Sequence, residues 1–317
     1  MPSAQCPSPR KSWPPELGSP AAFVSVPVKP LLEKLLASAP VITDGAWGTQ
    51  LQARGLGIGE FPDLWNLTNP GKVEEVARAY VDAGSQIILT NTFGANHVRL
   101  AETGRAAEAA AINRAGVEIS KRAAAGKAAV FASLGPSGKL LMTGEVTADE
   151  LSAAFTEQAQ ALAAAGADAL VVETMSDLDE AKLAVAAALT TGLPVVACMV
   201  FDAGKDKDRT MMGSTPEQVA KALTEAGADV IGANCGQGIT GFVPICQRLR
   251  AATDRPLWLK PNAGLPQLVD GRATYATTPE EFVAHVPELI KLGASFIGGC
   301  CGTSPAFIRA IIRSVRD

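Results

Sequence analysis

The sequence lacks the marks of several common protein classes. No apolar stretch in its 317 residues reaches the ~18 residues of a membrane-spanning helix, so no membrane segment is expected. Lysine and arginine never run for more than two residues and the formal net charge is −4, which argues against nucleic acid as a partner. The first 30 residues hold eight prolines and no apolar segment of a signal peptide, and we expect a cytoplasmic protein.

The chain has six cysteines, but they are not spaced like a disulfide framework, and a chain of this length does not need one. Its hydrophobic content of 47% is enough for a large core, in two domains or in one α/β barrel. The proline-rich segment 1–30 is expected to be a disordered extension in which Cys6 plays no part. The folded domain is expected to cover residues 31–317.

A short pattern recurs four times where predicted helices give way to strands. It reads A-G-S-Q-I-I from Ala83, A-G-A-D-A-L from Ala165, A-G-A-D-V-I from Ala226 and L-G-A-S-F-I from Leu292. In each copy a glycine ends a helix, two small or polar residues form the turn, and an apolar strand begins. The copies are far enough apart for two βα units each, so the pattern marks alternate strands.

Eight short strands complete this arrangement, and they are mostly apolar without alternation, as in strands that are buried on both faces. They are predicted at Val41–Asp44, Ile87–Thr90, Val130–Leu134, Ala169–Glu173, Val195–Val200, Val230–Asn234, Leu257–Pro261 and Phe296–Gly299. Between them, Thr147, Thr215 and Thr278 each begin a capping box, and Asn69 followed by Pro70 begins a further helix. This alternation predicts a single-domain (β/α)8 TIM barrel. The alternative is an open doubly wound sheet, although no G-x-G-x-x-G follows the first strand.

Polar residues gather at the carboxyl ends of these strands, where (β/α)8 barrels place their active sites. They are Asp44 and Gly45, Asn91 and Thr92, Ser133 to Gly135, Glu173 and Thr174, Asp202, Asn234 and Cys235, Asn262, and Cys300 and Cys301. Neither histidine, His97 or His285, follows a strand. The sequence therefore gives little support for catalysis by a Ser-His pair or by a histidine that acts as general acid or base.

Three cysteines at strand ends beside glycines, Cys235, Cys300 and Cys301, predict one metal site. Thiolates favour soft or borderline metals, and three protein ligands leave a fourth position open, so zinc is the expected metal. Such a site suits a sulfur substrate. Cys198 and Cys246 are expected to be buried as small apolar residues.

Three charged residues at strand ends allow more than one interpretation. Asp44 either caps a turn or binds a cation beside backbone N–H groups that face an anion. Glu173 ends a buried strand, where an unpaired carboxylate is costly, so it should pair with a substrate ammonium or with a neighbouring arginine. Lys260 is expected to face solvent or to form an ion pair, rather than to form a Schiff base.

Six motifs together resemble the homocysteine-binding domain of the homocysteine S-methyltransferases, over about residues 33–315. They are D-G-A-x-G-T at Asp44–Thr49, N-T-F-G at Asn91–Gly94, E-T-x-S-D at Glu173–Asp177, G-x-N-C at Gly232–Cys235, P-N-A-G at Pro261–Gly264 and G-G-C-C-G-T at Gly298–Thr303. The family includes cobalamin-dependent methionine synthase and betaine–homocysteine methyltransferase. The resemblance implies a zinc-dependent barrel enzyme that methylates homocysteine to methionine.

By this resemblance, the three strand-end cysteines are the zinc ligands. The positions that match contacts to the amino-acid part of homocysteine are Asp44, Gly45, Thr92 and Glu173. Zinc turns a coordinated thiol into a thiolate, which attacks an activated methyl group directly. No general base is then needed, and no catalytic residue is expected beyond the zinc site.

The resemblance leaves the methyl donor open. Gly94 and Thr174 stand in motifs where the betaine enzymes have tyrosines, and the chain has two tyrosines in all, whereas a cationic donor favours an aromatic cage. The chain also has no folate, cobalamin or activation module of full-length methionine synthase. We therefore expect methylcobalamin, carried by a separate corrinoid protein, as the donor. The alternatives are S-methylmethionine, S-adenosylmethionine or betaine as donor, a corrinoid methyltransferase for another substrate, and a non-catalytic zinc-binding barrel that binds a partner.

Overall fold

The computed structural model describes residues 29–269 and 272–316 of the chain. The predicted extension 1–30, with Cys6, lies outside the described residues except for Lys29 and Pro30. Helix α1 (Pro30–Leu36) begins at this proline. Within the described ranges, none of the helices combines the length and the apolar character that crossing a membrane requires. The cytoplasmic location stays a prediction.

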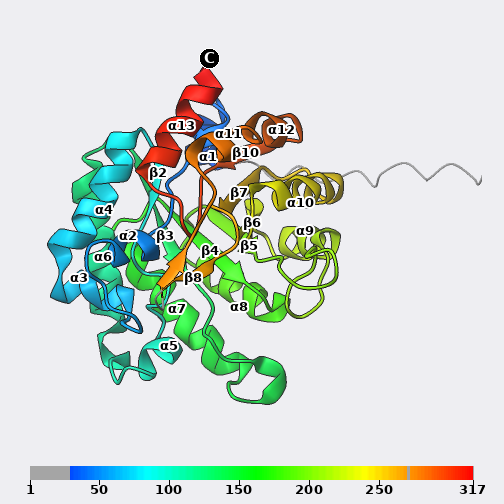
Figure 1. Cartoon of the computed structure of the whole chain (residues 1–317). Coiled ribbons are helices and arrows are strands. Elements are labelled where there is room, and N and C mark those ends of the chain that lie inside the picture. The colour runs from blue at the N-terminus through cyan, green and yellow to red at the C-terminus, as the bar shows by residue number, and fades with distance from the viewer. Residues whose placement is uncertain (1–28, 270–271, 317) are drawn as a thin grey trace, which may run out of the picture.

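Eight parallel strands form a nearly closed barrel at the centre of the protein (Figure 1). They are β1 (Val41–Ile42), β2 (Ile87–Leu89), β3 (Ala129–Leu134), β4 (Ala169–Met175), β5 (Val195–Met199), β6 (Val230–Gly238), β7 (Leu257–Asn262) and β10 (Ala294–Ile297). Their order in the sheet is β1-β10-β7-β6-β5-β4-β3-β2. Gln86 links the two end strands, because its N–H donates to the Ile42 carbonyl (2.7 Å) and its side-chain oxygen accepts from the Ile42 N–H (2.9 Å). The predicted TIM barrel is confirmed.

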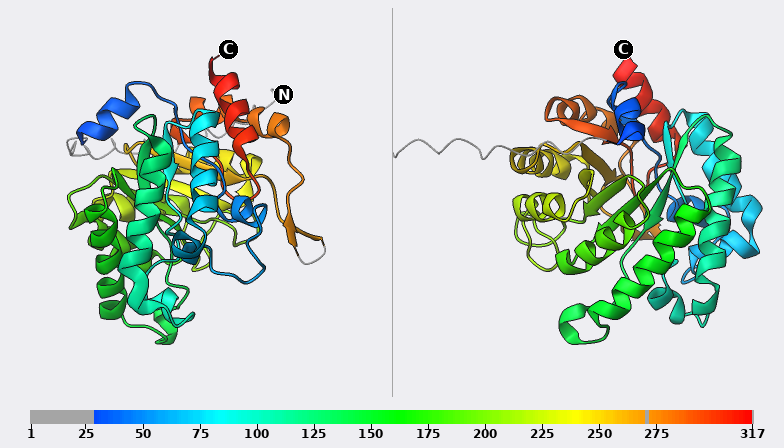
Figure 2. Two further views of the ribbon diagram at one scale, coloured as in Figure 1. Left: turned by 90° about the vertical axis from the view of Figure 1, so that its left-hand side faces the viewer. Right: turned by 180° about the vertical axis from the view of Figure 1, so that it is seen from behind.

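Helices surround the barrel on its outside (Figure 2). The helices that follow the strands are α4 (Pro70–Ala83), α6 (Ala109–Ala124), α7 (Ala148–Ala164), α8 (Leu178–Leu189), α9 (Pro216–Glu225), α10 (Ile239–Ala252), the pair α11 (Pro279–Val283) and α12 (Val286–Lys291), and α13 (Pro305–Arg316). Shorter helical segments in the loops are α2 (Gly48–Gln52), α3 (Trp65–Thr68), α5 (His97–Ala101), η1 (Pro62–Leu64), η2 (Ala106–Glu108) and η3 (Leu141–Thr143). The capping boxes predicted at Thr147, Thr215 and Thr278 begin α7, α9 and α11, with both hydrogen bonds of each box present.

Two layers of apolar side chains hold the strands. One cluster packs between the sheet and the helices, and a second, smaller one fills the inside of the barrel. In the inner cluster the ring of Trp258 lies between Phe131 and Phe296, with ring centroids 5.9 and 5.3 Å apart. Leu32 of α1 joins the same cluster. The barrel is thus a packed core rather than a pore, and its polar groups collect at the strand ends.

The structure differs from the predicted elements at some strand ends. β4 and β6 extend beyond Glu173 and Asn234, with a shift of pairing register in each. An antiparallel hairpin, β8 (Gln267–Val269) with β9 (Arg272–Thr274), follows β7 and was not predicted. Its strands are three residues long and β8 is exposed, so neither burial nor a two-residue period marks them in the sequence.

Candidate metal and substrate site

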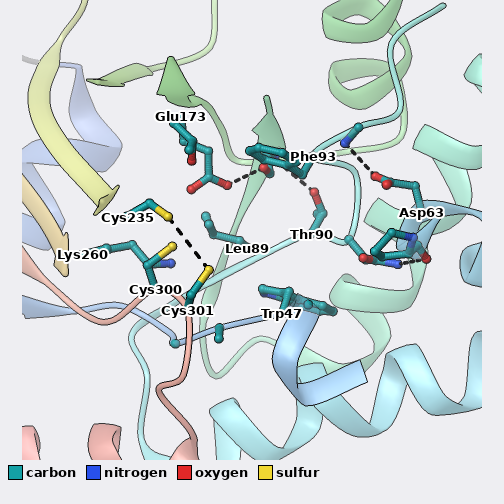
Figure 3. Close-up of a pocket in the computed structure, with 18 of the residues that line it drawn as sticks. Trp47, Asp63, Leu89, Thr90, Phe93, Glu173, Cys235, Lys260, Cys300 and Cys301 are labelled. Atoms are coloured by element: carbon teal, nitrogen blue, oxygen red, sulfur yellow. Dashed lines mark hydrogen bonds between the residues drawn. The ribbon is translucent and has the colours of Figure 1, made fainter. Parts of the chain in front are cut away.

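Three cysteine side chains converge at the carboxyl end of the barrel (Figure 3). Cys235 lies in β6, and Cys300 and Cys301 lie between β10 and α13. Their Sγ atoms all lie within 4.8 Å of one another, with 3.9 Å between those of Cys235 and Cys301. A tetrahedral zinc ion with Zn–S bonds of ~2.3 Å holds its sulfurs ~3.8 Å apart, so the cluster fits zinc. In residues 29–269 and 272–316, no other three His, Cys, Asp or Glu side chains converge in this way.

The local backbone aims these cysteines at one another. Cys235 has a left-handed φ of 62°, a conformation that costs a residue with a side chain ~1–2 kcal/mol. On the facing loop, the Cys300 N–H donates to the carbonyl oxygen of Pro261 at 2.8 Å. Gly298 lets this loop approach the first strand, because a Cβ atom there would lie 2.0 Å from Thr43 Oγ1.

Hydrogen bonding among the thiols shifts their pKa values in opposite directions. The thiols of Cys300 and Cys301 lower the pKa of Cys235, and the same interaction raises the pKa of Cys300 and of Cys301. One thiolate is thereby stabilised within the cluster, and a coordinated soft cation would favour the thiolate form of all three. Cys198 and Cys246 are buried in the core instead, and burial raises the pKa of both thiols. They are the small apolar residues that the sequence predicts.

The buried carboxylate of Asp44 is fully engaged by donors of the protein itself. Its Oδ1 forms an ion pair with Lys260 Nζ. Its Oδ2 accepts hydrogen bonds from the Trp47 indole N–H (2.8 Å) and from the Leu89 N–H (2.7 Å). Lys260 therefore has one of its two predicted environments, an ion pair. Asp44 does bind a cation, and that cation is a lysine of the same chain.

Glu173 is a buried carboxylate on the cavity wall. It accepts hydrogen bonds from the Ser133 hydroxyl (2.5 Å) and from the Asn234 amide (3.2 Å). Burial raises the pKa of Glu173, and the charge of Lys260 and the bond from Ser133 act against that rise. No arginine or lysine nitrogen of the described ranges lies within 4.0 Å of it. When ionised, Asp44, Lys260 and Glu173 carry a net charge of −1, which favours the entry of a cationic group.

Asn234 ties the ends of β4 and β6 together. Its Oδ1 accepts from the Thr174 N–H (2.7 Å), and its Nδ2 donates to Thr174 Oγ1 (2.6 Å) as well as to Glu173. Thr174 has a left-handed φ of 59°, and these bonds offset the cost of that conformation. Because Glu173 and Cys235 are the chain neighbours of the two bonded residues, this contact fixes both side chains relative to each other.

The cysteines and Glu173 open into a cavity of about 500 Å³. Of the predicted homocysteine contacts, Gly45 and Glu173 line this cavity, whereas Asp44 and Thr92 lie behind its wall. The Thr92 hydroxyl donates to the Ser133 carbonyl oxygen at 2.8 Å, so it supports the strand that carries a Glu173 partner. The role of all four residues toward homocysteine stays a prediction.

Several residues of the cavity wall were not recognised from the sequence. The rings of Trp47, Phe61 and Phe93 line the cavity, so the expectation of a rim without an aromatic cage took too few rings into account. Trp47 and Phe93 lie inside two of the motifs, so the sequence does contain a signal for them. Asp63 and Arg99 also line the cavity, and both come from loop regions without any motif.

Comparison with known proteins finds one matching family and several similar proteins. The sequence model of the homocysteine S-methyltransferase family matches residues 41–315. The chain is 33% identical over 302 residues to methionine synthase from Mycobacterium tuberculosis and 32% identical over 300 residues to that from Mycobacterium leprae. These alignments cover 89% and 90% of this chain and 25% of each relative, so the chain spans about a quarter of their length.

A solved structure is similar over nearly its whole length. The metallated form of the homocysteine methyltransferase MmuM from Escherichia coli superposes with a TM-score of 0.73 at 28% sequence identity, covering 90% of this chain and 99% of that one. The family match spans most of the described chain, and it agrees with the motifs at the strand ends. The chain therefore belongs to the homocysteine S-methyltransferase family.

Proposed function

We propose that this protein transfers a methyl group to the thiol of homocysteine and so forms methionine, with zinc held by Cys235, Cys300 and Cys301. The observation that carries the proposal is the convergence of three sulfurs on one wall of a cavity. The same cavity holds the Glu173 carboxylate, which has no cationic partner within 4.0 Å among the described residues. A thiol and an ammonium group are what these two features would bind, and homocysteine carries both.

Zinc bound to the three cysteines would keep a coordinated thiol in its nucleophilic thiolate form at neutral pH. The residues of the chain bind and orient the substrate around that position. Glu173 would accept hydrogen bonds from the homocysteine ammonium, and Gly45 would lie against the amino-acid part. Asp44 and Thr92 would act from behind the wall, because their polar atoms already bond to Lys260 and Ser133.

Methyl transfer in this site needs no acid–base residue. The homocysteine sulfur donates an electron pair to the methyl carbon, and the bond between that carbon and its carrier breaks with its electrons passing to the carrier. Among the described residues, no histidine lines the cavity. The scarcity of histidine thus fits the proposed reaction, in which the cavity aligns the sulfur, the methyl group and its carrier.

Two classes of methyl donor fit this cavity. Methylcobalamin on a separate corrinoid protein is the donor that the sequence favours, and the relatives named methionine synthase support the formation of methionine. A small onium donor, S-methylmethionine, S-adenosylmethionine or betaine, is the second candidate. The specific observation in its favour is the aromatic lining by Trp47, Phe61 and Phe93, since aromatic faces attract onium cations.

The experiment is a methyl-transfer assay with zinc-loaded protein, homocysteine and each of four donors in turn. Methionine formation is followed with free methylcobalamin, betaine, S-methylmethionine and S-adenosylmethionine, with Cys301→Ala as the zinc-free control. Turnover with the corrinoid alone supports the first donor, and saturable turnover with an onium compound alone supports the second. Zinc binding without turnover of homocysteine by any donor would contradict the proposed activity and favour a non-catalytic barrel or another acceptor.

A further inference from the structure

The cavity extends beyond the part that homocysteine would occupy. Its volume of about 500 Å³ accommodates a drug-sized ligand, and a small amino acid fills only part of it. Figure 3 shows the three cysteines and Glu173 on one side of the cavity and Asp63 on the opposite side, with Trp47, Thr90 and Phe93 between them. We call the opposite side the far lobe and define it by five of the cavity-lining residues, Phe61, Asp63, Phe93, Gly94 and Arg99. Glu60 also lines the cavity.

Arg99 is the cation of the far lobe. It lies on α5, and its guanidinium group sits over the ring of Phe61, 5.7 Å from the ring centroid. It also packs against Gly138, where a Cβ atom would lie 2.1 Å from Arg99 Nη1. The ring of Phe61 therefore contacts the guanidinium on one side, and the lack of a side chain at Gly138 leaves room for it on the other.

This guanidinium has no anionic partner in the part of the chain that the structure describes. It makes no ion pair within 4.0 Å and its side chain donates no hydrogen bond there. By contrast, the half-buried guanidinium of Arg248 pairs with both Asp208 and Glu217. An arginine without a partner is ordinary on an open surface, where water solvates it, but it is costly in a cavity that a ligand closes.

The nearby carboxylates are engaged elsewhere. Asp63 accepts a hydrogen bond from the Gly94 N–H at 2.9 Å, and burial raises its pKa to about 7, against the lowering effect of Arg99. Glu60 accepts from the Gly57 N–H at 3.1 Å, and Glu102 pairs with Lys139. None of these carboxylates forms an ion pair with Arg99 within 4.0 Å in the part of the chain that the structure describes, so its guanidinium is available to an anionic ligand.

We propose that the far lobe is a binding subsite for a carboxylate of the methyl donor, and that Arg99 is the residue that binds it. The planar fork of a guanidinium matches a carboxylate through two parallel hydrogen bonds. The inference rests on the proposed function, and specifically on a small donor: a zwitterion with a carboxylate at one end and a methylated onium centre at the other. The rings of Phe61 and Phe93 supply apolar surface for the body of such a molecule.

This placement gives the donor a direction. With its carboxylate on Arg99, its onium centre points back across the cavity toward the cysteine wall and the sulfur of homocysteine. The carbon–onium bond breaks and its electron pair stays on the departing sulfur or nitrogen, which becomes neutral. A new carbon–sulfur bond forms on homocysteine. Arg99 acts here through binding and orientation, and it takes no part in the bond changes.

The test is calorimetric titration of the zinc-loaded protein, saturated with homocysteine, with betaine and with S-methylmethionine. The carboxylate-free counterparts choline and trimethylsulfonium serve as ligand controls. The variants are Arg99→Gln, which removes the charge, and Arg114→Gln, an exposed arginine on α6, as the matched control. Homocysteine affinity and zinc content are measured in each protein.

We expect Arg99→Gln to weaken binding of the carboxylate-bearing compound at least tenfold, while Arg114→Gln leaves it unchanged. Binding of choline or trimethylsulfonium, homocysteine affinity and zinc content should be the same in all three proteins. The inference is overturned if wild-type protein binds neither zwitterion, or if Arg99→Gln binds them as well as wild type. Failure of the proposed function would show differently, as loss of homocysteine binding or of methionine formation with every donor.

Discussion

Lys260 Nζ lies 2.5 Å from Asp44 Oδ1, in an ion pair whose side chains are 3% and 0% exposed. The pair joins the carboxyl ends of β7 and β1, which are far apart in sequence and separated in the sheet only by β10. A buried ion pair is weak support for stability in itself, because desolvation offsets its attraction. The ion pair matters here because it fixes the position of Asp44, which in turn holds the Trp47 ring at the cavity wall.

Replacing Lys260 by methionine should therefore destabilise the fold. The change leaves the buried Asp44 carboxylate without its counter-charge, and breaking one side of a buried pair typically costs ~3–5 kcal/mol. Urea unfolding of the Lys260→Met protein measures the free energy of unfolding. Adding Asp44→Asn to this variant should recover part of the loss, and Lys221→Met, an exposed change on α9, should have little effect. An unaltered stability in Lys260→Met would contradict a structural role for this ion pair.

The purified protein should hold about one zinc ion through sulfur ligands. Cys235→Ala, Cys300→Ala and Cys301→Ala should each lose most of the metal, because two thiolates and water bind zinc less tightly than three thiolates. Metal analysis after dialysis against a weak chelator checks this. Cys198→Ala and Cys246→Ala are the matched controls, since both thiols lie in the core and should leave zinc in place. Full zinc occupancy in Cys301→Ala would rule out the site as described.

Glu173→Gln should raise the KM for homocysteine at least tenfold and leave zinc content unchanged. A charge-assisted contact to an ammonium is worth ~1.5–3 kcal/mol, and glutamine keeps the shape of the side chain without its charge. Steady-state kinetics with the best donor of the panel gives the KM. Glu180→Gln is the control, because Glu180 is also buried but bonds to the Ser137 N–H rather than facing the cavity. If both variants keep the wild-type KM, Glu173 is a structural carboxylate.

The sequence predicts which residues form the cysteine wall of the cavity, but it gives almost no sign of the far lobe. Cys235 and Glu173 can be located because each follows an apolar strand, and the barrel brings all such ends to one face. Phe61 and Arg99 belong to loops with no period and no motif, and their contact depends on how two loops fold over the mouth. Tertiary structure likewise decides which residue pairs with Lys260, because the local sequence indicates only that a lysine in a buried strand needs a counter-charge.

Asp63 should make stability depend on pH. Burial raises its pKa from the ordinary 3.8 to about 7, so the folded protein binds this proton more tightly than the unfolded chain does. Its contribution is therefore fully present below pH ~4 and is lost as the pH rises toward 7, by up to ~4 kcal/mol at 1.36 kcal/mol per pKa unit. Asp63→Asn cannot ionise, and its amide oxygen can still accept from the Gly94 N–H.

The difference in unfolding free energy between wild type and Asp63→Asn isolates this group, because the other titrating residues are common to both proteins. Urea unfolding at several pH values between 4 and 8.5 should show the two proteins similar in stability near pH 4. Above pH 7 the variant should be the more stable, since wild type then buries an ionised carboxylate that Arg99 compensates only in part. A difference that stays constant across this range would mean that Asp63 titrates near its ordinary pKa and that the far lobe is wetter than its burial indicates.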